Sequence, residues 1–134
     1  MSNMDAEALK KLAIVNSNEF NRGWNESNKN WEKFVEDFYN TDAVLYPPGS
    51  PPITGLKHIS TFLEVFPNNL KLHHSLRTVK STGEDSYFAI FSVPATIDEK
   101  QVDIFTSCEE WIKENGVWKI SNDFFNSDYE RVDY

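Results

Sequence analysis

The chain has 134 residues, with 13 Lys or Arg and 21 Asp or Glu, which gives a formal net charge of -8. Phosphate backbones and anionic membrane surfaces attract basic proteins, so we expect neither nucleic acid nor a membrane as a partner. A chain of this length is typical of one core, and residues 1–134 are predicted to form a single domain. The lone Cys108 cannot form an internal disulfide and the N-terminus lacks an apolar signal segment, so we predict a cytoplasmic location.

Three amphipathic helices are predicted in the first half of the chain. Apolar residues recur at intervals of three and four over residues 5–24, 31–40 and 59–66, with the polar Asn16 on the first of these stripes. Residues 43–46, between the second and third helices, are expected to form a short strand that ends at a proline-rich turn. Aromatic residues make up 14% of the chain, which predicts a large core, an apolar pocket or a subunit interface.

Four longer strands are predicted in the second half of the chain. Residues 70–80, 86–97, 101–113 and 117–125 alternate in polarity or are rich in β-branched and aromatic side chains. Short turn signals separate these segments, so neighbouring strands are expected to pair antiparallel. Helices that precede an antiparallel sheet in this way are typical of the α+β class.

Two segments are similar to motifs of the nuclear-transport-factor-2-like superfamily. The first is the strand and proline turn of residues 41–49, which continues to Gly55 and into the third predicted helix. The second is the closing strand of residues 116–123, followed by Asn126 and Ser127. The resemblance covers essentially the whole chain. It implies a cone-shaped α+β fold, in which a curved antiparallel sheet wraps around three N-terminal helices, an interior that often holds a small apolar ligand, and commonly a homodimer.

The resemblance leaves the function open, because the superfamily includes ketosteroid isomerases, scytalone dehydratase, SnoaL-like polyketide cyclases and noncatalytic domains. The ketosteroid isomerases that the chain resembles place an Asp general base on the first strand, just before the proline turn. This chain has Pro47 at that position, with Tyr46 and Pro48 beside it. Since proline cannot accept a proton, the resemblance does not carry the isomerase base over to this chain.

Three titratable residues are candidates for proton transfer. His74 shares a strand face with leucines, so it is expected inside as a general acid or base, or as a core histidine held by a hydrogen bond. Glu110 shares a face with apolar residues that would raise its pKa, unless it reaches solvent at the strand end. An unbroken strand would point Asn122 inward and Asp123 outward. One β-bulge would reverse them, and an inward Asp123 could orient His74.

Further side chains are candidates for ligand binding. Asn16 and Tyr46 are expected to line a cavity as hydrogen-bond donors to a carbonyl oxygen, and Asn122 would join them from an unbroken strand. Trp24 is expected either to line the cavity or to pack in the core. Three His and one Cys provide no metal-ligand spacing, and no Gly-rich loop joins a strand to a helix, so we expect no metal and no cofactor.

These features predict a domain that binds a small hydrophobic or carbonyl-bearing ligand in an aromatic-lined cavity. The alternative is a cofactor-free isomerase, cyclase or dehydratase. In that enzyme His74 or Asp123 would move a proton next to a carbonyl, while Tyr46 or Asn16 would stabilise the enolate oxygen. A second alternative is a noncatalytic dimerisation domain. Residues 87–93 are apolar on both strand faces, which predicts a buried second face and hence a homodimer.

Overall fold

The computed structural model describes residues 5–26 and 29–128. The predicted domain of residues 1–134 extends outside these ranges, as does the start of the N-terminal segment in which no signal sequence is predicted. The three predicted helices are confirmed as α1 (Ala6–Asn25), α2 (Trp31–Phe38) and α3 (Leu56–Leu63).

The first two helices begin at side chains that cap them. The Asp5 carboxylate accepts a hydrogen bond from the backbone N–H of Ala8 at 2.8 Å, and Asn30 Oδ1 accepts one from the N–H of Lys33 at 3.1 Å. Both bonds satisfy an N–H that has no partner within the helix. Polar residues placed just before the apolar stripes therefore fix where α1 and α2 start.

The strands form one seven-stranded sheet in the order β2-β1-β7-β6-β5-β3, with β4 also paired to β5. Their bounds are β1 (Tyr39–Tyr46), β2 (Ile53–Thr54), β3 (Lys71–Leu72), β4 (Ser75–Gly83), β5 (Ser86–Ile97), β6 (Lys100–Glu114) and β7 (Val117–Ser127). The predicted antiparallel pairing of successive long strands is confirmed: β4 pairs with β5, β5 with β6 and β6 with β7. The sheet is nevertheless mixed, because β1 runs parallel to β7. Only short hairpin turns enforce antiparallel pairing, and no such turn joins β1 to β7.

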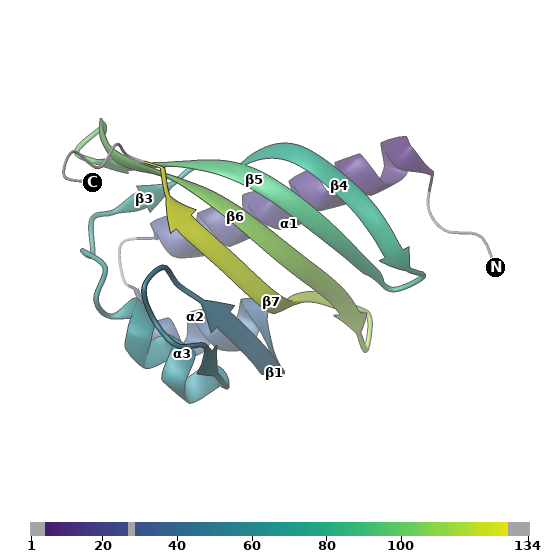
Figure 1. The fold of residues 1–134 in the computed structure, drawn as a ribbon, viewed down its shortest axis with the longest axis horizontal. Helices are drawn as coiled ribbons and strands as arrows, with labels where there is room; N and C mark the ends of the chain where they lie inside the picture. Colours follow the sequence, from purple (N-terminus) through teal and green to yellow (C-terminus); the bar gives the residue numbers. More distant parts are fainter. Residues whose placement is uncertain (1–4, 27–28, 129–134) are drawn as a thin grey trace.

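Figure 1 shows the curved, unclosed sheet with α1 across one face and with α2 and α3 beside β1. We call the face toward the helices the inner face and the opposite one the outer face. The inner face and the helix stripes bury a largely aromatic core whose most enclosed side chains include Trp111, Tyr87, Phe91, Leu45, Ile59 and Ile120. The fold is α+β, as predicted.

Two irregularities of the sheet decide which polar side chains reach its inner face. The predicted strand of residues 70–80 is interrupted at His73 and His74. In β7, Asn122 pairs with Glu110 while Ile120 pairs with Trp111, so Ser121 is an extra residue without a partner in β6. A bulge of one residue shifts the alternation of the following side chains. It turns Asp123 to the inner face.

Candidate functional site

A small pocket lies between the inner face of the sheet, α1 and α3. Its volume is about 60 Å³, and nine of its fourteen lining residues are apolar or aromatic. The other five carry polar side chains, which we call the polar floor: Tyr39, His74, Ser107, Glu109 and Asp123. Since one water needs roughly 10–15 Å³ by such a measure, the pocket holds a few water molecules or a very small ligand.

A second, larger groove of about 510 Å³ separates α1 from α2, but its chemistry is that of a solvated surface. Arg22 forms an ion pair with Glu19, and Lys33 forms one with Asp37 at 3.1 Å; all four side chains are largely exposed. Exposed pairs of neighbouring helix residues are typical of helix surfaces. The small pocket is therefore the better candidate for a functional site.

His74 reaches the pocket from the break between β3 and β4. Its Nδ1 lies 2.7 Å from Oδ1 of Asn21 on α1, and its Nε2 lies 3.2 Å from Oε2 of Glu109. Its side chain is 4% exposed and that of Glu109 is 3% exposed. Because an amide oxygen only accepts, Nδ1 donates to Asn21, and the contact between Nε2 and Oε2 holds one shared proton.

The break itself is stabilised by α1. The side chain of Asn25 accepts a hydrogen bond from the N–H of Leu72 and donates one to its carbonyl oxygen, both at 2.9 Å. This amide thus supplies the two backbone hydrogen bonds that a neighbouring strand would otherwise make with Leu72. The side chains of Asn21 and Asn25 lie one turn apart on α1. Together they hold the ring of His74 against Glu109 in the polar floor.

Glu109 lies at the centre of the polar floor and is the residue that the sequence did not reveal. Ser107 Oγ donates to its Oε2 and Trp111 Nε1 donates to its Oε1, each at 2.9 Å. The alternation of β6 places Ser107, Glu109 and Trp111 inside. One feature of the sequence could have indicated this orientation: Trp111, whose size favours the core, lies on the same strand face as Glu109. The pairing of β6 with the buried residues of β5 agrees with it.

Asp123 and Tyr39 form the second half of the polar floor. Tyr39 Oη donates a hydrogen bond to Asp123 Oδ2 at 2.7 Å, and both residues are buried. Burial raises the pKa of the Asp123 carboxyl well above its usual range, the nearby charge of Glu109 raises it further, and the bond from Tyr39 lowers it. This environment favours the neutral carboxyl, which can donate its own proton to a ligand.

Of the predicted site residues, His74, Asp123 and Trp24 line this pocket. Asp123 does so through the bulge, as the second of the two predicted arrangements of β7. Trp24 Nε1 donates to the carbonyl oxygen of Leu70 at 3.0 Å, so its polar atom is occupied in the core and its ring forms the wall. Trp24 thus both packs in the core and lines the cavity.

Glu110 and Asn122 do not reach the pocket, which is the second of the two alternatives that the sequence left open for each of them. They lie opposite each other on the outer face, where Asn122 Nδ2 donates to Glu110 Oε1 at 2.8 Å. The even-numbered residues of β6 are the more apolar set, which suggested that they faced the core. The outer face carries these apolar residues because the inner alternation is occupied by Ser107, Glu109 and Trp111.

Tyr46 and Asn16 also lie outside the pocket. Tyr46 stacks on Phe124 of the neighbouring strand, with ring centroids 4.0 Å apart and planes at 3°, because the pocket side of β1 is taken by Leu45. Asn16 does face the sheet, but it donates to Tyr87 Oη at 2.9 Å from the middle of α1 and is not a lining residue. The predicted roles of both residues in the cavity are therefore wrong.

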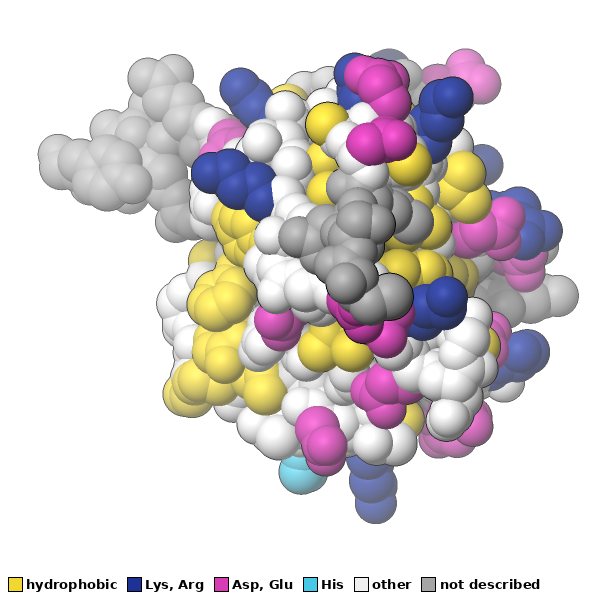
Figure 2. All heavy atoms as spheres, turned by 90° about the vertical axis from the view of Figure 1, so that its right-hand side faces the viewer, with side chains coloured by type: hydrophobic (Ala, Val, Ile, Leu, Met, Phe, Trp, Pro, Cys, Tyr) yellow, Lys and Arg dark blue, Asp and Glu magenta, His cyan; other side chains and the backbone are white. Residues whose placement is uncertain are grey.

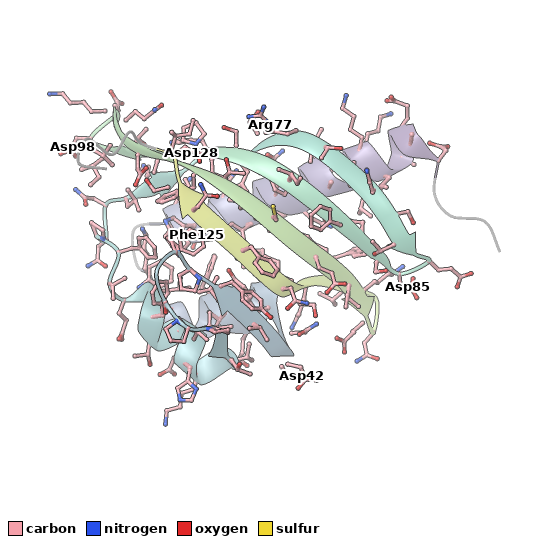
Figure 3. The ribbon with its side chains drawn as sticks, viewed as in Figure 1. Asp42, Arg77, Asp85, Asp98, Phe125 and Asp128 are labelled. Atoms are coloured by element: carbon pink, nitrogen blue, oxygen red, sulfur yellow. The ribbon has the colours of Figure 1, made fainter. Side chains whose placement is uncertain are left out.

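Burial distinguishes the two acids of the floor from the acids at the surface. The four aspartates labelled in Figure 3 are all exposed: Asp42, Asp85, Asp98 and Asp128. Among the described residues, no three side chains of the metal-binding types gather closely enough to hold an ion. Within the same ranges, no helix has the length and apolar character needed to cross a membrane.

This structure combines a curved sheet, helices packed against its inner face and, between them, a largely apolar pocket with a buried polar floor. These features define a class of cone-shaped α+β domains. The chain belongs to the nuclear transport factor 2 domain family. The model of that family, "Nuclear transport factor 2 (NTF2) domain", matches residues 26–127. This confirms the resemblance seen in the sequence. Among curated proteins, none matches the chain.

Solved structures of the same fold are similar over nearly the whole chain. A ketosteroid isomerase-like protein from Erwinia carotovora atroseptica has a TM-score of 0.68 and 18% identity, over 96% of this chain and 100% of its own. A Catenulispora acidiphila protein in complex with S-DNPA has a TM-score of 0.70 and 17% identity, over 91% and 95%. An NTF2-like protein with a cystatin-like fold from Novosphingobium aromaticivorans has a TM-score of 0.73 and 9% identity, over 93% and 85%. At these identities the likeness shows the fold alone.

Proposed function

We propose that the pocket binds a small, mainly apolar molecule through one hydrogen-bond-accepting group such as a carbonyl oxygen. The observation that carries this proposal is the Asp123–Tyr39 pair in a pocket whose walls are mainly apolar. Tyr39 satisfies Oδ2 of Asp123, whereas Oδ1 has no hydrogen-bond partner among the described residues. A neutral carboxyl with one free oxygen offers a single donor in surroundings of low polarity, where such a bond is strong.

The experiment for this proposal compares Asp123→Leu with its neighbour Asn122→Leu. Leucine at 123 keeps an apolar side chain of similar size but removes the donor, whereas residue 122 lies on the outer face. We expect Asp123→Leu to bind cyclopentanone about fivefold more weakly than the wild type, since one hydrogen bond contributes about 1 kcal/mol. Asn122→Leu should bind it as the wild type does. An NMR titration measures both affinities; equal affinity in Asp123→Leu and the wild type would contradict the proposal.

A second candidate function is proton transfer next to the bound carbonyl. The observation that favours it is the buried His74–Glu109 contact in the same pocket as Asp123. With the shared proton on His74 Nε2, the Glu109 carboxylate would take a proton from a carbon acid and later return it, and a hydrogen bond from Asp123 would stabilise the enolate oxygen. Such an enzyme would be a cofactor-independent isomerase, lyase or cyclase.

We also propose that the chain forms a homodimer through its outer face. Phe124 is 47% exposed and stacks on Tyr46 there. In Figure 2, hydrophobic side chains gather on the left, which is the side that faces the viewer in Figure 1 and carries the outer face of the sheet. Exposed apolar patches of this kind support association. The cytoplasmic location stays a prediction that rests on the sequence.

A further inference from the structure

The pocket has a mouth made of three phenylalanines. Eleven of the fourteen lining side chains are almost fully buried, including that of His74, which is 4% exposed. The three remaining lining residues, Phe66, Phe105 and Phe125, are half-buried. Since only these side chains contact both the pocket and the solvent, they separate the polar floor from the surface.

The three rings form one cluster with Phe125 in the middle. The Phe125 centroid lies 5.7 Å from that of Phe105, with the planes at 87°, and 6.5 Å from that of Phe66. Phe66 follows α3, Phe105 lies on β6 and Phe125 lies near the end of β7, where Figure 3 labels it. Phe105 and Phe125 thus pack edge to face, whereas the planes of Phe66 and Phe125 are tilted by 50°, and rings at these separations attract one another. Among the described residues, these three side chains narrow the mouth of the pocket.

The pocket is too small for a ligand with a ring unless the three phenylalanines at its mouth move apart. A dry apolar cavity of about 150 Å³ is known to hold benzene, whereas this pocket has about 60 Å³. The walls behind the mouth are tightly enclosed, for example Leu45 at 1% and Val93 at 2% exposure, and a close-packed wall does not yield easily. A ring at the mouth, by contrast, can change rotamer toward solvent.

We propose that Phe125, held by Phe66 and Phe105, is an aromatic gate that determines the size of molecule admitted to the pocket. The gate deepens the proposed function and rests on it, because it assumes that the pocket takes up a ligand. In the closed state the gate admits only molecules of a few atoms. With Phe125 turned outward, the space of its ring joins the pocket, and a single-ring ligand reaches the donor on Asp123.

The test measures the affinity for benzene by isothermal titration calorimetry in the wild type, Phe125→Ala and Phe88→Ala. Phe88 is a matched control: it is also a half-buried phenylalanine, but it lies on the outer face of β5 and away from the pocket. We expect Phe125→Ala to bind benzene about tenfold more tightly than the wild type, equivalent to about 1.4 kcal/mol, because no ring has to be displaced. Phe88→Ala should bind benzene as the wild type does.

A folded Phe125→Ala that binds benzene no more tightly than the wild type would overturn the gate, and so would an equal gain in Phe88→Ala. If Phe125→Ala does not fold, Phe66→Ala removes the other side of the mouth and has the same expected gain. Benzene has no hydrogen-bonding group, so its binding does not depend on Asp123. The gate can thus fail while cyclopentanone still distinguishes Asp123→Leu from the wild type, and the reverse outcome is equally visible.

Discussion

Glu109 accepts hydrogen bonds from Ser107 and Trp111, and its side chain is 3% exposed. These two bonds therefore fix its position before any ligand enters. A fixed position of this kind is typical of a group that transfers protons, whereas a surface carboxylate is hydrated and changes its orientation. Oε2 of Glu109 lies 3.2 Å from Nε2 of His74, so the proton that these two atoms share can be bound to either of them.

The role of Glu109 is tested against its neighbour in β6. We expect the wild type to accelerate deuterium exchange beside the carbonyl of cyclopentanone in D₂O, and Glu109→Gln to lower this rate about a hundredfold, as loss of a general base does. Glu110→Gln makes the same chemical change on the outer face and should keep the wild-type rate. NMR spectra recorded over time follow the exchange. Exchange in Glu109→Gln at the wild-type rate would exclude Glu109 as the base.

At the scale of elements, the end of α1 and the short strand β3 act as one unit. Asn25 replaces a strand neighbour for Leu72, Trp24 bonds the Leu70 carbonyl, and Asn21 bonds both the N–H and the ring of His74. Alternate residues from Leu70 to His74 are thus bound to one end of a helix. The orientation of His74 therefore depends on the packing of α1 against the sheet.

This coupling predicts the cost of losing the Asn25 amide. Asn25→Ala removes two half-buried hydrogen bonds, so we expect the free energy of unfolding to fall by about 2 kcal/mol. Asn18→Ala changes an exposed residue of the same helix and should alter it by less than about 0.5 kcal/mol. Urea denaturation measures both variants. An Asn25→Ala protein as stable as Asn18→Ala would show that α1 does not hold β3 in this way.

The outer face concerns the whole molecule, since it is the side of the sheet that none of the helices in residues 5–26 and 29–128 covers. Apart from the stack of Tyr46 on Phe124, it carries the Glu110–Asn122 bond and the half-buried Cys108. An apolar patch with hydrogen-bonding groups at its margin has the composition of many subunit interfaces. The pocket opens elsewhere, so a dimer through this face would leave the gate free.

Sedimentation of the wild type and Phe124→Ser tests the dimer. We expect the wild type to sediment as a dimer at micromolar concentration and Phe124→Ser as a monomer, because serine removes the exposed ring from the centre of the contact. Val117→Ser alters another exposed apolar residue, at the start of β7, and should remain a dimer. A wild-type protein that sediments as a monomer would contradict the proposal.

The order and type of the elements followed from the sequence because each depends on local patterns. The stripes of α1 and α2 and the long strands β5 and β6 involve residues that are close in the chain. The family could also be recognised, since its motifs are continuous segments. An inward His74 was predicted because its leucine neighbours share one strand face, and the structure has it there despite the break.

Only the tertiary structure decided which carboxylates form the site. Glu109 rather than Glu110 faces inward because β6 must match the buried residues of β5, and Asp123 does so because β7 accommodates an extra Ser121. The parallel pairing of β1 with β7 likewise joins segments far apart in the chain. A shift of one residue exchanges the two faces of a strand. That choice depends on contacts between distant residues, which a local pattern of polarity does not contain.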